Sequence, residues 1–203
     1  SVSSVAKMVF KTVSISSLLL FPMMVGLAAV AEPLVSLLLT DKWLECVPYL
    51  QIFAIGYLFQ AIQLAIIQAI KAIGDSGTPL KLEIIKKCVE VFFLIVTIRQ
   101  GVLIFASSLL ICSVISHLLN MFAAKRILNY TVKQQLIDIL PATLFSAVMA
   151  ACVKCVTQLL NGAFVSLVAG IATGVAVYLL LCMLFRVPEI KQLKNKLFKR
   201  KHA

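Results

Sequence analysis

The sequence predicts an all-α integral membrane protein with six transmembrane helices. Hydrophobic residues make up 62% of the 203-residue chain and charged residues only 13%, with a mean hydropathy of +1.05. The apolar residues fall into six long stretches separated by short polar loops, and about 20 such residues let one helix cross a bilayer. A water-soluble domain of this composition would expose large apolar patches, whereas a bilayer would cover them.

The distribution of positive charge predicts how these helices are oriented. Of the 19 Lys and Arg residues, 16 lie in or beside alternate loops on one side of the predicted membrane. The other three, Lys42, Arg99 and Lys154, lie on the opposite side. Because cytoplasmic loops are enriched in Lys and Arg, both ends of the chain are predicted to face the cytoplasm.

The first predicted helix spans residues 12–31 and contains two residues that favour bending. Pro22 lies near its middle, where it removes one backbone hydrogen bond, and Gly26 follows about one turn later. Pro22 and Gly26 are therefore candidates for helix bending. A short apolar segment, residues 34–40, is expected to lie along the far membrane surface or to re-enter the membrane slightly, just before the loop that carries Trp43.

Five further helices are predicted, each ended by a polar turn. The helix over residues 47–70 leads into a turn rich in Gly, Asp, Ser and Pro. The others are predicted over residues 80–98, 102–123, 136–157 and 163–185.

Residues 186–203 form a basic tail directly after the last apolar stretch. Seven basic residues lie between Arg186 and Lys201. A basic segment beside a membrane attracts anionic lipid headgroups by about 1 kcal/mol per residue. The net charge of +11 is therefore interpreted as favouring anionic lipids, and no nucleic-acid partner is predicted.

The helix predicted over residues 80–98 carries charged side chains through its first half. Lys86 and Glu90 are four residues apart and are expected to pair on one face, with Lys87 beside them. Two interpretations remain open: an ion pair at the cytoplasmic interface, or a helix whose inner half lines water. In the second, Lys86, Lys87 and Glu90 line a substrate cavity.

Two other predicted helices place polar side chains at membrane depth. Gln60 and Gln63 share one helix face, where they can bond to another helix or line a cavity. His117 and Asn120 form one polar stripe with Ser113. The stripe can serve structural hydrogen bonding, with proton coupling through His117 as the alternative. Gln60, Gln63, His117 and Asn120 complete the set of candidate cavity residues.

No catalytic constellation or metal site is expected. The chain has two histidines and lacks a Ser-His-Asp set and an HExxH motif. Cys152 and Cys155 form a CxxC pair, but a structural zinc site needs about four ligands, so both are interpreted as small apolar helix residues. The predicted loops are also too short to hold catalytic groups. The chain is therefore not expected to be an enzyme or to bind a cofactor.

Several short sequences in the first part of the chain carry a family resemblance. They are FPMMVGL at 21–27, AEPLVSLLL at 31–39, Lys42-Trp43, VPYLQI at 47–52 and KLEIIKK at 81–87. Their order and spacing resemble the bacterial polysaccharide transporter family, which includes flippases for O-antigen, capsule and teichuronic acid. That family shares a superfamily with multidrug extruders and lipid II flippases. The resemblance covers most of residues 8–130.

The resemblance implies a fold of two six-helix bundles around a central cavity. On this basis residues 1–130 are the last four helices of the C-terminal bundle, residues 131–185 are two additional C-terminal helices, and residues 186–203 are a cytoplasmic tail. The chain begins at Ser1 rather than Met, which fits the expectation of a C-terminal fragment.

The function implied by the resemblance is export by flipping across the bacterial cytoplasmic (inner) membrane. An undecaprenyl-diphosphate-linked oligosaccharide would cross by alternating access, as in O-antigen or lipopolysaccharide synthesis, with polysaccharide polymerase machinery as a further expected partner. Two alternatives stay open. One is an ion-coupled small-molecule or multidrug exporter that uses an intramembrane carboxylate such as Glu90, and the other is a membrane scaffold that transports nothing.

Overall fold

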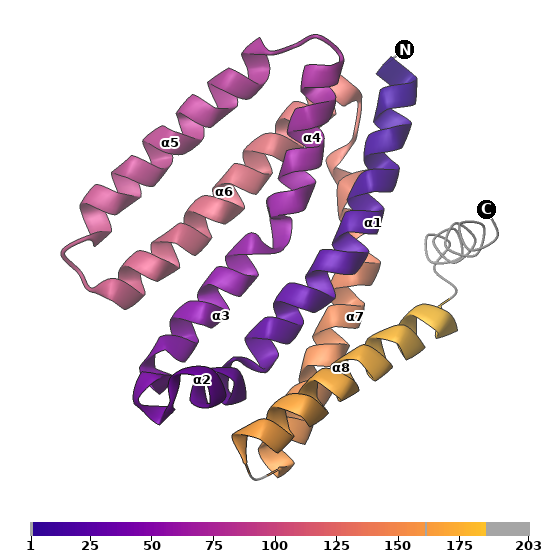
Figure 1. Ribbon diagram of the computed structural model, residues 1–203. Helices are drawn as coiled ribbons and strands as arrows, with labels where there is room; N and C mark the ends of the chain where they lie inside the picture. Colours follow the sequence, from indigo (N-terminus) through magenta and orange to yellow (C-terminus); the bar gives the residue numbers. More distant parts are fainter. Residues whose placement is uncertain (1, 161, 186–203) are drawn as a thin grey trace, which may run out of the picture.

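A computed structural model describes residues 2–160 and 162–185, and this part of the chain is helical throughout apart from short turns (Figure 1). The predicted all-helical fold class is confirmed. The basic tail predicted over residues 186–203 lies outside the described residues. The elements in chain order are α1 (Val2–Ala29), α2 (Ala31–Leu39), η1 (Asp41–Cys46), α3 (Val47–Gly56), η2 (Tyr57–Phe59), α4 (Gln60–Ala72), α5 (Gly77–Thr97), α6 (Val102–Leu128), α7 (Val132–Leu159) and α8 (Ala163–Leu184).

Five segments of the described chain are long and apolar enough to cross a membrane, which makes this a multi-pass membrane protein. They are Met8–Ala29, Asp41–Ala72, Val102–Leu128, Val132–Leu159 and Ala163–Leu184. The remaining helix, α5, has 21 residues and is about 32 Å long. It carries charged residues through its first half, so its place as the sixth span stays a prediction.

The helices form two groups that meet along α1. α1 packs against α7 on one side and against α3 and α4 on the other, while α8 packs mainly on α7 (Figure 1). α5 lies at the edge of the bundle, where α6 is its main neighbour. One face of α5 is therefore left without helical cover in the described chain.

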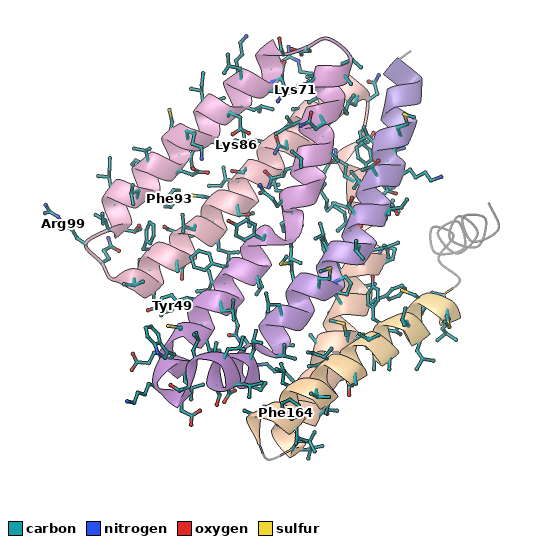
Figure 2. The ribbon with its side chains drawn as sticks, viewed as in Figure 1. Tyr49, Lys71, Lys86, Phe93, Arg99 and Phe164 are labelled. Carbon is teal, nitrogen blue, oxygen red and sulfur yellow. The ribbon has the colours of Figure 1, made fainter. Side chains whose placement is uncertain are left out.

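The described loops that are rich in Lys and Arg lie at one end of the helix bundle, as predicted from the sequence. Figure 2 places Lys71, at the turn between α4 and α5, at one end of the bundle, and Arg99 and Phe164 toward the other. The start of α1 and the turn between α6 and α7 lie at the Lys71 end (Figure 1). Among residues 2–160 and 162–185, the loops that carry most of the Lys and Arg residues thus share one end.

The segment predicted as a single helix over residues 47–70 is interrupted in the structure. A short 3-10 turn, η2, separates α3 from α4 directly after Gly56. The Ser113 hydroxyl of α6 donates to the Gly56 carbonyl oxygen at 2.6 Å. Glycine is a weak helix former. At this break a hydroxyl from the neighbouring helix bonds to the backbone carbonyl of Gly56, so that carbonyl is not left unpaired inside the bundle.

The turn between α6 and α7 is held by a buried tyrosine and a buried glutamine. Tyr130 stacks on Phe10 of α1 with ring centroids 4.2 Å apart, and its hydroxyl donates to Asp138 at 2.6 Å. Burial, reinforced by the Asp138 hydrogen bond, raises the pKa of Tyr130 well above its ordinary value. The Gln135 amide donates to the Tyr130 carbonyl oxygen at 2.7 Å. These contacts join α7 to the end of α6.

Pro22 leaves an open backbone acceptor in α1, and α8 supplies the missing donor. Proline has no N–H, so the carbonyl of Leu18, four residues earlier, loses its usual helical partner. The Tyr178 hydroxyl of α8 donates to that carbonyl oxygen at 2.7 Å, and Tyr178 is buried. Figure 1 shows that α1 changes direction along its length, as expected for a helix with an internal proline.

Tyr178→Phe is expected to lower the free energy of unfolding by about 0.5–1.5 kcal/mol, because the Leu18 carbonyl would lose its donor. In a Pro22→Leu background the same change is expected to have little effect, since the restored backbone N–H can bond to Leu18. The measurement is thermal unfolding, in detergent, of the unchanged protein, the two single variants and the double variant. It gives the energetic coupling between Pro22 and Tyr178. An equal effect of Tyr178→Phe in both backgrounds would show that Pro22 and Tyr178 act independently.

Candidate substrate cavity

A polar cavity of about 360 Å³ lies between α3, α4, α5 and α6. Its polar walls come from three places: the region of the α3–α4 break, the charged half of α5 and the serine-bearing face of α6. Five of the sequence-predicted site residues line it: Gln60, Gln63, Lys86, Lys87 and Glu90. The structure also adds Glu83, Cys112, Ser113 and Ser116, together with apolar residues of α3 and α6.

Lys86 is the most unusual side chain of the cavity because it is charged and only 6% exposed. Its Nζ donates to Glu83 Oε1 at 3.0 Å, and Glu83 is about half exposed. A buried ammonium without such a partner would be strongly disfavoured. The ion pair therefore holds a positive charge at the cavity wall, within the helix bundle.

The predicted pairing of Lys86 with Glu90 is wrong. Lys86 pairs with Glu83, while Glu90 accepts from Lys87 at 2.6 Å on the more exposed side of α5. Spacings of three and four residues both bring side chains together on a helix. The packing of Lys86 into the bundle, with Lys87 68% exposed, decides which carboxylate each lysine meets.

Gln63 and Asn120 join α4 to α6 behind the cavity wall. The Asn120 side-chain amide donates to Gln63 Oε1 at 2.9 Å, and both side chains are buried. Gln60, one turn earlier on α4, is exposed and lines the same cavity. Gln63 thus makes the predicted interhelical bond and also lines the cavity, whereas Asn120 is not among the lining residues.

Asn120→Leu is expected to destabilise the protein by about 0.6–2 kcal/mol, because Gln63 would lose its donor in a buried site. Adding Gln63→Leu is expected to recover part of that loss, since both polar groups are then removed. The measurement is a double-mutant cycle on thermal unfolding. Ser107→Ala serves as the control, because the Ser107 hydroxyl bonds within α6 to Leu103. Fully additive effects of the two leucine changes would contradict the pairing.

His117 lies beside the cavity and is not one of its lining residues. Its ring stacks on Phe59 of η2 with centroids 4.3 Å apart and planes 23° apart. The side chain is 6% exposed, and its Nδ1 has no hydrogen-bond partner within residues 2–160 and 162–185. The position supports the α3–α4 break by packing, and proton coupling through His117 remains untested.

The two candidate bending residues lie away from the cavity. Pro22 lies one turn after Leu18, whose carbonyl bonds to Tyr178 of α8. A side-chain carbon built at Gly26 would lie 3.5 Å from Met149 Cε of α7, an ordinary van der Waals distance. Gly26 therefore lies at the α1–α7 contact, and its role in bending stays a prediction.

Sequence reasoning missed Glu83 and the Gly56 backbone as parts of the site. The signal for Glu83 was present, since it lies three residues before Lys86. For the break, Gly56 itself is a weak signal, but the Ser113 hydroxyl that bonds to its carbonyl lies on another helix. Within the described segments, no group of three His, Cys, Asp or Glu side chains could hold a metal ion.

Comparisons with known proteins agree with this architecture. Residues 2–48 match the family model described as "Polysaccharide biosynthesis protein". No curated protein sequence matches the chain. Among solved structures, the chain is similar to "Lipid II flippase MurJ, inward closed conformation", with 21% identity and a TM-score of 0.72.

The structural match covers 91% of this chain and 43% of the flippase, so the chain spans about two fifths of the protein it resembles. At this level of identity the match shows a shared fold. The fold that the resemblance implied is confirmed, and the family match of residues 2–48 is consistent with it. The chain is thus a multi-pass helical membrane protein with a flippase fold.

Proposed function

We propose that this chain is part of a flippase for lipid-linked oligosaccharides in a bacterial cytoplasmic membrane, and that the Lys86 cavity contributes to the substrate path. The observation that carries the proposal is a buried, charged lysine in a polar cavity of a flippase fold. Ionisable groups at membrane depth are costly and usually mark the route of a polar substrate. The family match of residues 2–48 supports a polysaccharide-linked substrate.

The cavity offers chemistry suited to an undecaprenyl-diphosphate-linked sugar. The ammonium groups of Lys86 and Lys87 would attract the diphosphate as compact positive charges. Each of these lysines forms an ion pair with a glutamate, and the diphosphate would replace that carboxylate as its partner. Gln60, Gln63 and Ser116 would hydrogen-bond sugar hydroxyls, while the lipid tail would remain along the apolar outer surface.

The open side of α5 supports the assignment of the chain to one part of a larger transporter. Lys87 is largely exposed, and most large apolar side chains in the second half of α5 are exposed as well. We assign residues 1–130 to the last four helices of the C-terminal bundle, with a second bundle covering the open side. Residues 131–185 would be the additional pair, which fits the packing of α7 and α8 on α1, away from the cavity.

The loops with most of the positive charge would face the cytoplasm, because basic loops are retained there. The end that carries Arg99 and Phe164 would then face outward (Figure 2). In this orientation the charged half of α5 begins on the side where the lipid-linked substrate is made. The protein would move substrate without catalysing a covalent reaction.

A translocation assay tests the proposal. The native full-length protein would be reconstituted into vesicles with a fluorescent oligosaccharide on undecaprenyl diphosphate, and appearance of the label in the far leaflet would be followed with an impermeant quencher. Protein-dependent transfer is expected. Denaturing mass spectrometry of the native protein is expected to give at least about twice 22.2 kDa, since the fold match covers 43% of a complete flippase.

Absence of transfer by a correctly folded protein would contradict the flippase assignment. The ion-coupled exporter is the second candidate, because the carboxylate of Glu90 lines the cavity. It predicts that Glu90→Gln abolishes ion-gradient-driven efflux of small molecules and that lipid-linked sugar is not moved. A scaffold predicts neither activity.

A further inference from the structure

A second polar cavity lies at the end of the bundle opposite Lys71. It has a volume of about 320 Å³ and lies where the end of α1, α2 and η1 meet the turn between α7 and α8. This is also where the two helix groups are joined, since α2 packs against α8. Its charged and amide-bearing lining residues are Glu32, Asp41, Gln51, Lys154 and Gln158.

The charged side chains of this cavity have both signs, and their charges are not neutralised by one another. Glu32 and Asp41 supply two carboxylates and Lys154 one ammonium. None of the three forms an ion pair with another described residue, although Asp41 accepts a hydrogen bond from the Ser36 hydroxyl. An anion alone would meet net negative charge here, whereas a zwitterion with an ammonium and a phosphate would find a partner for each group.

Exposed apolar side chains lie beside the cavity on the elements that build it. On α2, Ala31 and Val35 are buried while Leu38 is 69% exposed. At the α7–α8 turn, Leu159 is 82% and Phe164 is 65% exposed, and Figure 2 shows Phe164 at this end of the bundle. Such surfaces at the ends of membrane spans lie among lipids, so the cavity combines a polar recess with room for acyl chains nearby.

From this combination we infer that this second polar cavity binds the headgroup of a zwitterionic aminophospholipid such as phosphatidylethanolamine. Lys154 contacts the phosphate, and Glu32 and Asp41 accept hydrogen bonds from the ammonium. The acyl chains run past the exposed apolar residues of α2 and the α7–α8 turn. The bound lipid braces the contact between α1–α2 and α7–α8. The inference concerns lipid binding and stands independently of the proposed transport activity.

The test is thermal stability and lipid retention of the native full-length protein in vesicles of stated composition. Phosphatidylethanolamine is expected to raise the unfolding temperature above that in phosphatidylcholine, which lacks N–H donors, or phosphatidylglycerol, which lacks the ammonium. Native mass spectrometry is expected to show one retained phosphatidylethanolamine. Lys154→Gln or Glu32→Gln is expected to weaken that retention about tenfold.

Arg99→Gln and Glu45→Gln are the matched controls: Arg99 lies toward the same end (Figure 2), Glu45 lies on η1, and neither lines the cavity. They are expected to leave lipid retention unchanged. Equal stabilisation by all three lipids, or equal loss in the controls, would overturn the inference. Preferential protection by a soluble oligosaccharide would also overturn it and would assign the cavity to sugar. Because no transport is measured, these outcomes are distinct from failure of the flippase proposal.

Discussion

Lys86→Gln in the full-length protein is expected to reduce transfer of a diphosphate-linked oligosaccharide about ten- to a hundredfold. The change removes the buried positive charge while keeping a side chain of similar length. A hydrogen bond to a charged group is worth about 1.5–3 kcal/mol, and each 1.4 kcal/mol is about a factor of ten. Initial transfer rates in vesicles, normalised to folded protein, measure the effect.

The design separates loss of transport from loss of folding. Lys81→Gln is the matched control, because Lys81 lies on the same helix, is exposed and does not line the cavity. Glu83→Gln would remove the partner of Lys86. It is expected to lower stability more than Lys86→Gln, because it leaves a buried ammonium unpaired. A normal transfer rate in Lys86→Gln at normal abundance would contradict a role of this cavity in transport.

Gly170→Val is expected to destabilise the protein by about 1–3 kcal/mol through overpacking. A side-chain carbon built at Gly170 on α8 would lie 3.0 Å from Thr157 Cγ2 of α7 and 3.1 Å from Val30 Cγ1 at the end of α1. Gly174, one turn later, lies similarly close to Val153. These small residues let α8 approach its neighbours, as in other membrane helix contacts, so added volume would separate three segments at once.

Ala172→Val is the control for this prediction. Ala172 lies on the exposed side of α8, where the same side chain would meet lipid. Unfolding temperatures in detergent are expected to fall for Gly170→Val and to change little for Ala172→Val. Equal values for the two variants would show that α8 does not pack through Gly170.

Much of the fold could be predicted because membrane helices follow simple rules. The predicted segment 163–185 agrees closely with α8, and the segment 102–123 begins where α6 begins, although α6 continues to Leu128. Bilayer thickness requires long apolar runs, and polar turns end them. The helix predicted over residues 47–70 is divided in the structure into α3, η2 and α4. At the break after Gly56, the backbone carbonyl accepts a hydrogen bond from a hydroxyl of α6, which lies far away in the sequence.

The sequence predicted which residues belong to the candidate site better than it predicted how those residues pair with one another. Gln60, Gln63 and Lys86 were selected for their depth, and the structure brings them to one cavity. Their partners were harder to predict. Lys86 bonds to Glu83 instead of Glu90, because a helix offers a lysine more than one carboxylate and only its burial decides between them.

The sequence by itself determined that this is a helical membrane protein, roughly where its apolar spans lie, and which described loops share the basic end. These properties follow from the cost of placing charge and unpaired backbone groups in hydrocarbon. Only the tertiary structure decided which polar groups meet. Tyr178 reaches the Leu18 carbonyl across 160 residues, and Asn120 reaches Gln63 across 57. Such pairs depend on which faces two helices present to each other, because a buried polar group bonds to whichever partner the packing brings within reach.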